Sequence, residues 1–396
     1  MAGIGYGELN PSPRLLMGPG PSDAHPRVLR AMGTPLLGHL DPEFLALMEE
    51  TKTLLRAVFG TTNELTIPVS ATGSAGMEAA FVNVVEPGDE VVVCVNGVFG
   101  ERMSDIVGRC GANLTRVDAD WGTIVPAEKV AAALKTVNNP KVVAIVHAET
   151  STGVLQPLDD IAKLARDSGA LFLVDAVTSL AGVPVNVDAT GIDVAYSGTQ
   201  KCLSCPPGLS PVTFGERALE VMQTRKTKVQ SWYLDMSMIA KYWGEERVYH
   251  HTAPISMVYA IREALRLVDE EGIEARYERH RLHSAALAAG LEALGLGLGA
   301  QEGHRAPMLT LTKIPEGVAD GVIRKRLLAE FNIEVGGGLG VFAGKMWRIG
   351  LMGESCQRSS VLTCLDALET CLRGEGQSIG AGAGVSAALG YYATTG

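Results

Sequence analysis

Short apolar runs rich in β-branched residues alternate with amphipathic stretches through the first half of the chain. The strand-length runs and the helical patterns between them are Val91–Val95, Pro126–Leu134, Val142–Val146, Leu158–Ser168, Leu171–Val174 and Val194–Tyr196. This alternation predicts an α/β fold, in which helices cover both faces of a mostly parallel sheet. Ligands of such sheets bind at the carboxyl ends of the strands, so the residues after each run are candidates for a site.

A different pattern occupies the second half of the chain. One long amphipathic helix is predicted from Pro254 through Val268, continuing toward His280–Leu291. Two strand patterns and two helical patterns follow, over Met308–Thr312, Val318–Phe331, Trp347–Gly350 and Ser359–Leu372. We expect a smaller α+β domain to begin near Glu271.

The length of the chain supports a division into domains. A chain of 396 residues is too long for one hydrophobic core, because cores stop growing near about 250–300 residues. We predict an N-terminal arm over residues 1–14, a large domain over 15–270 and a small C-terminal domain over 271–373. The tail over 374–396, rich in Gly, Ala and Ser, is of low complexity and is expected to be partly disordered.

Charge and cysteine content narrow the class of protein. The net charge is −10, from 34 basic and 44 acidic residues, and no stretch concentrates Lys and Arg, so a nucleic-acid partner is not expected. No apolar run approaches the ~20 residues that span a membrane, and the first residues lack the features of a signal peptide. Seven scattered cysteines indicate reduced thiols, and no metal site is expected, because the Cys202–Cys205 pair has no second pair at zinc spacing. We expect a cytoplasmic protein without membrane contact.

A lysine and an aspartate follow neighbouring predicted strands. The strand ending at Tyr196 runs into a polar turn that ends in Lys201, and the strand Leu171–Val174 is followed directly by Asp175. A lysine in this position forms a Schiff base if burial or a neighbouring cation depresses its pKa; the alternative is an ordinary solvated loop lysine. An Asp that keeps a pyridine nitrogen protonated, beside a Lys that holds an aldehyde, is the pair that pyridoxal-phosphate chemistry needs.

Three further features suit the same chemistry. The small-residue segment Thr72–Gly76 opens into a helical pattern, so that backbone N–H groups and the helix N-terminus can hold a phosphate. Phe99 follows a strand and offers a face for a planar ring, or is plain core. Arg348 lies between apolar neighbours in a predicted strand and offers a bidentate fork for a carboxylate.

Seven ordered motifs carry a resemblance to a known family. They are Leu16-Met-Gly-Pro-Gly-Pro-Ser22, Glu149-Thr-Ser-Thr-Gly-Val-Leu-Gln-Pro-Leu158, Val174-Asp175, Tyr196-Ser-Gly-Thr-Gln-Lys201, Arg225-Lys-Thr-Lys228, Tyr249-His-His-Thr252, and Gly337-Gly-Leu-Gly340 followed by Arg348-Ile-Gly-Leu351. From about Leu15 to Leu372 the chain resembles the alanine–glyoxylate and serine–pyruvate (serine–glyoxylate) aminotransferases. These are class V, fold-type I enzymes that depend on pyridoxal 5'-phosphate.

The resemblance implies a fold, a cofactor and roles for individual residues. The fold would be a large domain with a mostly parallel, seven-stranded type of sheet and a smaller α+β domain. Lys201 would carry the cofactor as a Schiff base and then move the proton, and Asp175 would pair with the pyridinium. The other implied residues are Phe99 for stacking, Thr72, Gly73, Ser74 and Gln200 for the phosphate, Thr150 for the phenolic oxygen, Val177 as a further cofactor contact, Arg348 for the substrate carboxylate and Gly20 lining the pocket.

The resemblance also implies partners and a reaction. Tyr249 and Thr252 would reach the phosphate of the neighbouring subunit, which makes the protein a homodimer with active sites at the interface; without the resemblance, Tyr249 reads as an ordinary interface residue. An amino group would pass from alanine or serine to glyoxylate, giving glycine and a 2-oxo acid.

Three other functions compete with this interpretation. The (S)-ureidoglycine–glyoxylate aminotransferases of purine catabolism are similar in the segment Arg276–Arg281 and in an extension after Leu372, but tend to carry Asn where this chain has Tyr249. A cysteine desulfurase of the same fold would need an exposed, mobile nucleophile, for which Cys356 is the candidate. A non-catalytic binding module would have no need of Lys201, Asp175 and Arg348 together.

Overall fold

The computed structural model of the chain describes residues 7–395; residues 1–6 of the predicted arm and residue 396 of the tail lie outside this range. The larger lobe is built on a seven-stranded sheet with strand order β2-β10-β9-β8-β5-β3-β4. Only β10 runs antiparallel to its neighbours among these strands. The strands are β2 (Leu65–Val69), β3 (Glu90–Val95), β4 (Asn113–Asp118), β5 (Pro140–Val146), β8 (Leu171–Asp175), β9 (Val194–Tyr196) and β10 (Ser210–Phe214).

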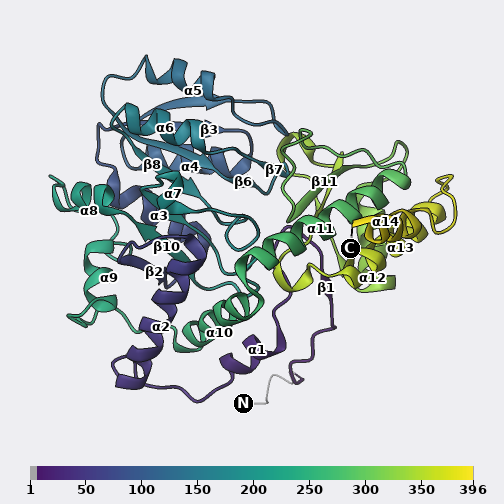
Figure 1. The fold of residues 1–396 in the computed structure, drawn as a ribbon, viewed down its shortest axis with the longest axis horizontal. Coiled ribbons are helices and arrows are strands. Elements are labelled where there is room, and N and C mark those ends of the chain that lie inside the picture. Colours follow the sequence, from purple (N-terminus) through teal and green to yellow (C-terminus); the bar gives the residue numbers. More distant parts are fainter. Residues whose placement is uncertain (1–6, 396) are drawn as a thin grey trace, which may run out of the picture.

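Helices surround this sheet in the larger lobe (Figure 1). They are α1 (Pro26–Met32), α2 (Pro42–Phe59), α3 (Gly73–Val84), α4 (Val98–Arg109), α5 (Ala127–Leu134), α6 (Asp159–Asp167), α7 (Val187–Thr190), α8 (Glu216–Gln223), α9 (Met236–Trp243) and α10 (Ile255–Glu271). Strands covered on both faces are buried throughout, as β2, β8, β9 and β10 are at every position, whereas the edge strand β4 is mostly exposed or half-buried. This explains why the strands read as continuous apolar runs in the sequence.

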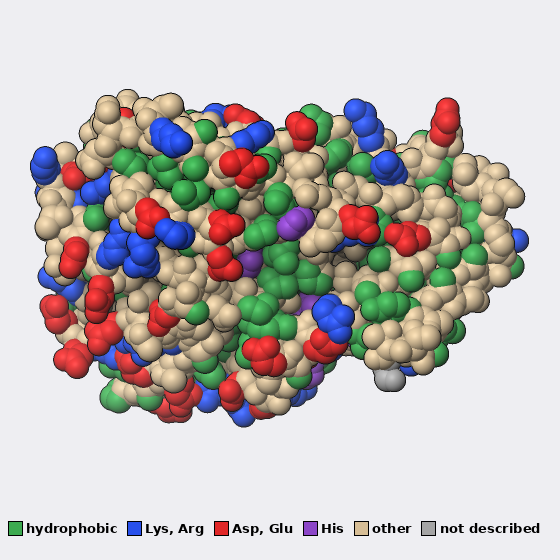
Figure 2. Space-filling view, turned by 45° about the horizontal axis from the view of Figure 1, so that its top comes forward, with side chains coloured by type: hydrophobic (Ala, Val, Ile, Leu, Met, Phe, Trp, Pro, Cys, Tyr) green, Lys and Arg blue, Asp and Glu red, His purple; other side chains and the backbone are tan. Residues whose placement is uncertain are grey.

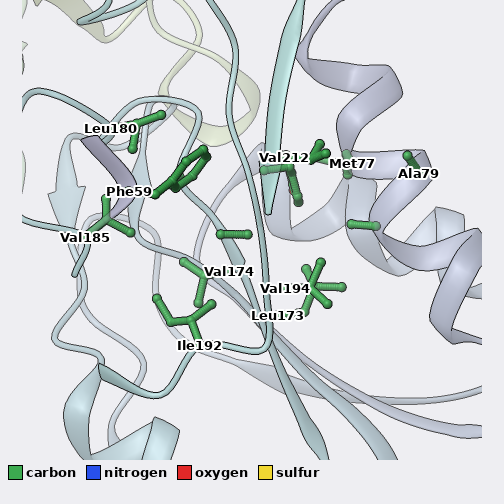
Figure 3. Packing of buried hydrophobic residues seen from close by; sticks show 14 of the residues in the cluster. Phe59, Met77, Ala79, Leu173, Val174, Leu180, Val185, Ile192, Val194 and Val212 are labelled. Atoms are coloured by element: carbon green, nitrogen blue, oxygen red, sulfur yellow. The ribbon is translucent and has the colours of Figure 1, made fainter. Parts of the chain in front are cut away.

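The core of the larger lobe packs directly beneath the strand ends that carry the candidate site. Figure 3 shows Leu173 and Val174 of β8 and Val194 of β9 among the buried side chains between sheet and helices. Met77 of α3 lies in the same cluster. Close packing of this kind fixes the ends of β8 and β9 relative to the first turn of α3.

The smaller lobe has its own hydrophobic cluster, around Leu287, Trp347 and Leu368. It contains α11 (Ile273–Ala293), α12 (Asp320–Phe331), α13 (Arg358–Gly374), α14 (Ala383–Thr395) and the short turns η1 (Gly340–Phe342) and η2 (Gly353–Ser355). Its three-stranded sheet has the order β11-β14-β13. The remaining strands are β11 (Leu309–Lys313), β13 (Gly336–Gly337), β14 (Met346–Gly350), and the two pairs β1 (Leu15–Leu16) with β12 (Ile333–Glu334) and β6 (Ala148–Glu149) with β7 (Val154–Leu155).

The predicted long helix is two helices in the structure. Gly272 has φ 83° and separates α10 from α11, because a left-handed residue ends a right-handed helix. The predicted boundary near Glu271 falls at this break.

The expectation of partial disorder in the tail is wrong for Ala383–Thr395, which forms α14. Tyr392 is 7% exposed, its hydroxyl lies 2.7 Å from Nδ1 of His283, and Arg358 stacks on its ring. The Glu369 carboxylate accepts the backbone N–H of Gly382 at 2.7 Å, just before the helix. Composition suggested a loose tail, whereas its small residues let α14 pack closely on α11 and α13.

Acidic and basic side chains are spread over the face shown in Figure 2, and hydrophobic side chains gather along its middle, where the two lobes meet. Within residues 7–395, no helix is long and apolar enough to cross a membrane.

Candidate active site

Lys201 is buried where the N-terminal segment, at Pro19 and Gly20, crosses the turn after β9. Lys201 is only 7% exposed, and its Nζ donates a hydrogen bond to the carbonyl of Pro19. Burial, and then the positive charge of Arg348, lower the pKa of Lys201 to about 8. A lysine with this pKa is neutral in part near pH 7 and can act as a nucleophile.

Gly20 borders the Lys201 amine directly. A Cβ at this position would lie 2.6 Å from Nζ, and the backbone has φ 110°. A side chain here would clash with the Lys201 amine, so Gly20 lies directly beside it.

Asp175 ends β8 and is 2% exposed. Its Oδ1 accepts the N–H of Val177 at 2.8 Å, and its Oδ2 accepts the hydroxyl of Tyr196 at 2.7 Å, across the β8–β9 pair. Burial raises the pKa of Asp175 to about 7, although both hydrogen bonds oppose the rise. A buried carboxylate of this kind is stabilised by a cationic partner, such as a protonated ring nitrogen.

Arg348 lies in the middle of β14 and is 8% exposed. Nε donates to the carbonyl of Gly337 at 2.8 Å and Nη1 to the carbonyl of Thr150 at 3.4 Å. The ion pairs formed among residues 7–395 do not include this guanidinium, and burial lowers its pKa. It is therefore held in place by carbonyls while its charge stays available for a substrate carboxylate. The Thr150 side chain hydrogen-bonds the hydroxyl of Thr178 at 2.6 Å.

The first turn of α3 lies beside the same strand ends. Thr72 is the N-cap residue but makes no side-chain cap bond, so the first N–H groups of the helix are available for an anion. A Cβ on Gly73 would meet Val177 and Gly198 at 3.4 Å each. The buried Oε1 of Gln200 has no hydrogen-bond partner among the described residues. An oxygen acceptor cannot bind a phosphate oxygen, so Gln200 could bind a phosphate only through its amide NH2 group, beside the free N–H groups of α3.

Phe99 is the second residue of α4 and is half-buried. Its N–H donates to Glu149 at 3.1 Å, and the guanidinium of Arg102 lies 4.9 Å from its ring centroid. Glu149 is 1% exposed and also accepts the hydroxyl of Ser151 at 2.6 Å. Sequence reasoning missed both Glu149 and Tyr196, although each lay inside a motif that had been singled out.

Tyr249 and Thr252 do not join Lys201 within one chain. They lie in the loop between α9 and α10, where Tyr249 is 56% exposed and its hydroxyl is 3.4 Å from Thr252 Oγ1. The intervening His251 lies 2.7 Å from the hydroxyl of Ser70, just before Thr72. The loop is thus anchored near the first turn of α3, with Tyr249 directed outward.

Cysteine chemistry does not suit this site. All seven cysteines are buried and unpaired, and burial raises the pKa of Cys356 to about 12. Such a thiol is neither mobile nor ionised, as a desulfurase nucleophile must be. No group of three potential metal ligands occurs within residues 7–395.

Comparison with known proteins gives concordant matches. Residues 20–364 match the family model described as aminotransferase class-V. The crystal structure of an alanine–glyoxylate aminotransferase from Nostoc sp. is 52% identical, with a TM-score of 0.92, over 93% of this chain and 98% of that one. A ureidoglycine–glyoxylate aminotransferase from Bacillus subtilis is 44% identical, with a TM-score of 0.96, over 98% and 100%. The alanine–glyoxylate aminotransferase of Callithrix jacchus is 41% identical over 91% of this chain and 88% of its own.

Proposed function

The chain belongs to the class-V aminotransferases, which use pyridoxal phosphate, and we propose that it transfers an amino group from alanine or serine to glyoxylate. The products are glycine and a 2-oxo acid. The observation that supports the proposal is that Lys201, Asp175 and Arg348 are all buried and that the charges of Arg348 and Asp175 both act on the Lys201 amine, in a chain whose relatives are named as glyoxylate aminotransferases.

The residues of the pocket divide the work of the reaction. The bound cofactor supplies an aldehyde that takes up the amino group and a ring that withdraws charge from the α-carbon. Arg348 binds the substrate carboxylate through its guanidinium. Lys201, with its pKa lowered to about 8, would take the proton from the substrate α-carbon on Nζ and return it in the reverse half-reaction. Asp175 would keep the ring nitrogen of a bound cofactor protonated.

Other side chains would orient the cofactor. Phe99 would stack on its ring, Val177 would contact it and Thr150 would hydrogen-bond its phenolic oxygen. Thr72, Gly73, Ser74 and Gln200 would bind the phosphate. The donor and glyoxylate both carry a carboxylate and bind in turn to the same arginine, so the kinetics should be ping-pong.

The active form would be a homodimer. Several large apolar side chains near the loop of Tyr249 and Thr252 are exposed in the single chain: Leu36, Leu40, Trp232, Tyr233 and Val248. Exposed aromatic and aliphatic groups of this kind are typical of subunit interfaces. Tyr249 and Thr252 would reach the partner's phosphate site. The unpaired cysteines suit a cytoplasmic enzyme.

A second candidate is transfer from (S)-ureidoglycine to glyoxylate. The Bacillus ureidoglycine enzyme aligns with 98% of this chain, against 93% for the Nostoc alanine enzyme. The longer match favours this alternative, because the chain has an ordered C-terminal helix, α14, beyond the family model. Tyr249 favours alanine or serine.

An amino-donor screen distinguishes the two candidates. Glycine formation from glyoxylate is measured with alanine, serine and freshly generated ureidoglycine, beside Lys201→Ala as the matched control. Turnover with alanine or serine supports the first proposal. Turnover with ureidoglycine alone refutes it in favour of the second, and turnover by the Lys201→Ala protein contradicts both.

A further inference from the structure

The groups proposed to hold the cofactor phosphate are all electrically neutral. They are the side chains of Thr72, Ser74 and Gln200 together with the N–H groups of α3. A phosphate monoester carries about −1.5 to −2 charges at pH 7, and the chain itself has a net charge of −10. A helix N-terminus compensates only about half a charge, so tight binding calls for a cation at this end of the pocket.

Arg102 is the cation that the structure brings to the first turn of α3. It lies on α4, one turn after Phe99, and Nη1 donates to the hydroxyl of Ser74 at 3.1 Å. Its guanidinium rests over the Phe99 ring at 4.9 Å from the centroid. These two contacts hold the charge between the proposed phosphate residues and the proposed stacking ring.

The charge of Arg102 is not committed to a carboxylate. The ion pairs found within residues 7–395 do not include it, whereas Arg109, two turns later on α4, pairs with Asp105 at 2.7 Å. Both arginines line a cavity of about 440 Å³ together with Ser74, Glu78 and Asp105. Arg102 therefore has space beside Ser74, and no ion pair between Arg102 and a carboxylate of the described residues would have to break for it to bind an anion there.

We propose that Arg102 is a cofactor-binding residue, which supplies the positive charge for the phosphate of pyridoxal phosphate through its position at Ser74 and Phe99. The inference rests on the proposed cofactor site. Cation–π contact with Phe99 positions the guanidinium, and a charge-assisted hydrogen bond to phosphate is about twice as strong as a neutral one. The contribution should be specific to the phosphate, because pyridoxal carries a neutral hydroxymethyl group in its place and so offers Arg102 no negative charge.

The test compares two aldehydes that differ only in the phosphate. Cofactor-free wild-type protein, Arg102→Gln and the matched control Arg109→Gln are titrated with pyridoxal 5'-phosphate and with pyridoxal, following the Schiff-base absorbance. We expect Arg102→Gln to raise the Kd for pyridoxal 5'-phosphate by about tenfold or more and to leave the Kd for pyridoxal within about twofold. Arg109→Gln should change neither value.

Other outcomes would overturn the proposal. An equal loss for both aldehydes would mean that Arg102 acts through the ring or the fold, and an unchanged Kd for the phosphorylated form would mean that it does not bind phosphate. Equal effects of the two substitutions would mean that only the general charge of the cavity matters. Thermal unfolding of the cofactor-free proteins shows whether either variant has lost its fold. If the wild-type protein bound neither aldehyde, the cofactor site at Lys201 would be refuted instead.

Discussion

Replacing Arg348 with lysine should lower kcat/KM for the amino donor and for glyoxylate by about the same factor. The guanidinium is positioned by the carbonyls of Gly337 and Thr150, and its remaining N–H groups form the fork proposed to bind the carboxylate. Lysine keeps the positive charge but cannot form the fork. Because the amino donor and glyoxylate would use this site in turn, the damage must appear in both half-reactions.

The size of the effect follows from the hydrogen bonds removed. A hydrogen bond to a charged group contributes about 1.5–3 kcal/mol, and each 1.4 kcal/mol is about tenfold in affinity. Arg348→Lys loses one such bond, so kcat/KM should fall by about 10- to 150-fold. Arg348→Ala loses both bonds and the charge, so the expected fall is about 10²- to 10⁴-fold.

The assay is steady-state kinetics with each substrate varied in turn. Arg324→Lys is the matched control, since Arg324 also belongs to the smaller lobe but is paired with Asp320 at 2.7 Å. The amount of cofactor bound per chain should stay unchanged in all three proteins. A fall in kcat/KM for one substrate only, or an equal fall in the Arg324→Lys protein, would refute the role of Arg348 as the shared carboxylate site.

Three further predictions concern the pocket and the tail. In cofactor-free protein, the rate at which Lys201 forms a Schiff base with added pyridoxal should rise with pH and level off above its pKa of about 8, where the amine is neutral. Because the charge of Arg348 helps to lower the pKa of Lys201, Arg348→Gln should move the plateau of the rate to higher pH. A plateau at the same pH would contradict the coupling. Tyr196→Phe removes the 2.7 Å hydrogen bond to Asp175, which favours the ionised carboxylate, so kcat should fall by about 10- to 150-fold with little change in unfolding temperature; unchanged kcat would show that Tyr196 is only a packing residue. Deleting residues 383–396 exposes the smaller-lobe surface that α14 covers, so the unfolding temperature should fall while the cofactor absorbance persists; an unchanged temperature would mean that α14 adds no stability.

Sequence patterns located four strands of the seven-stranded sheet, β3, β5, β8 and β9, because these inner strands are buried on both faces; no run was assigned to β2, β4 or β10. Each of the four predicted runs lies inside an observed strand that is longer by at most two residues, as Val142–Val146 lies inside β5. The helix break at Gly272 was missed, since helical periodicity continues on both sides and only the backbone angle of φ 83° shows the interruption. The order in α14 was missed because its stability comes from contacts with α11 and α13, which composition does not encode.

In the candidate site, too, residue positions could be predicted from the local sequence, whereas contacts that depend on tertiary packing could not. Lys201 and Asp175 could be proposed from their positions after strands, because the carboxyl ends of parallel strands meet. The contact between Tyr196 and Asp175 depends on the register of β8 and β9, and that between Glu149 and Phe99 on how α4 packs; neither follows from spacing in the chain. The proposed roles of Tyr249 and Thr252 depend on a second subunit.

The central claim is that Lys201 carries the cofactor, and chemical trapping tests it most directly. The cofactor-loaded protein is treated with borohydride, which reduces the Schiff base to a stable amine, and the labelled peptide is identified by mass spectrometry. The account predicts a phosphopyridoxyl group on Lys201 and on no other lysine. A label at a different lysine, or an unlabelled protein after reduction, would contradict it.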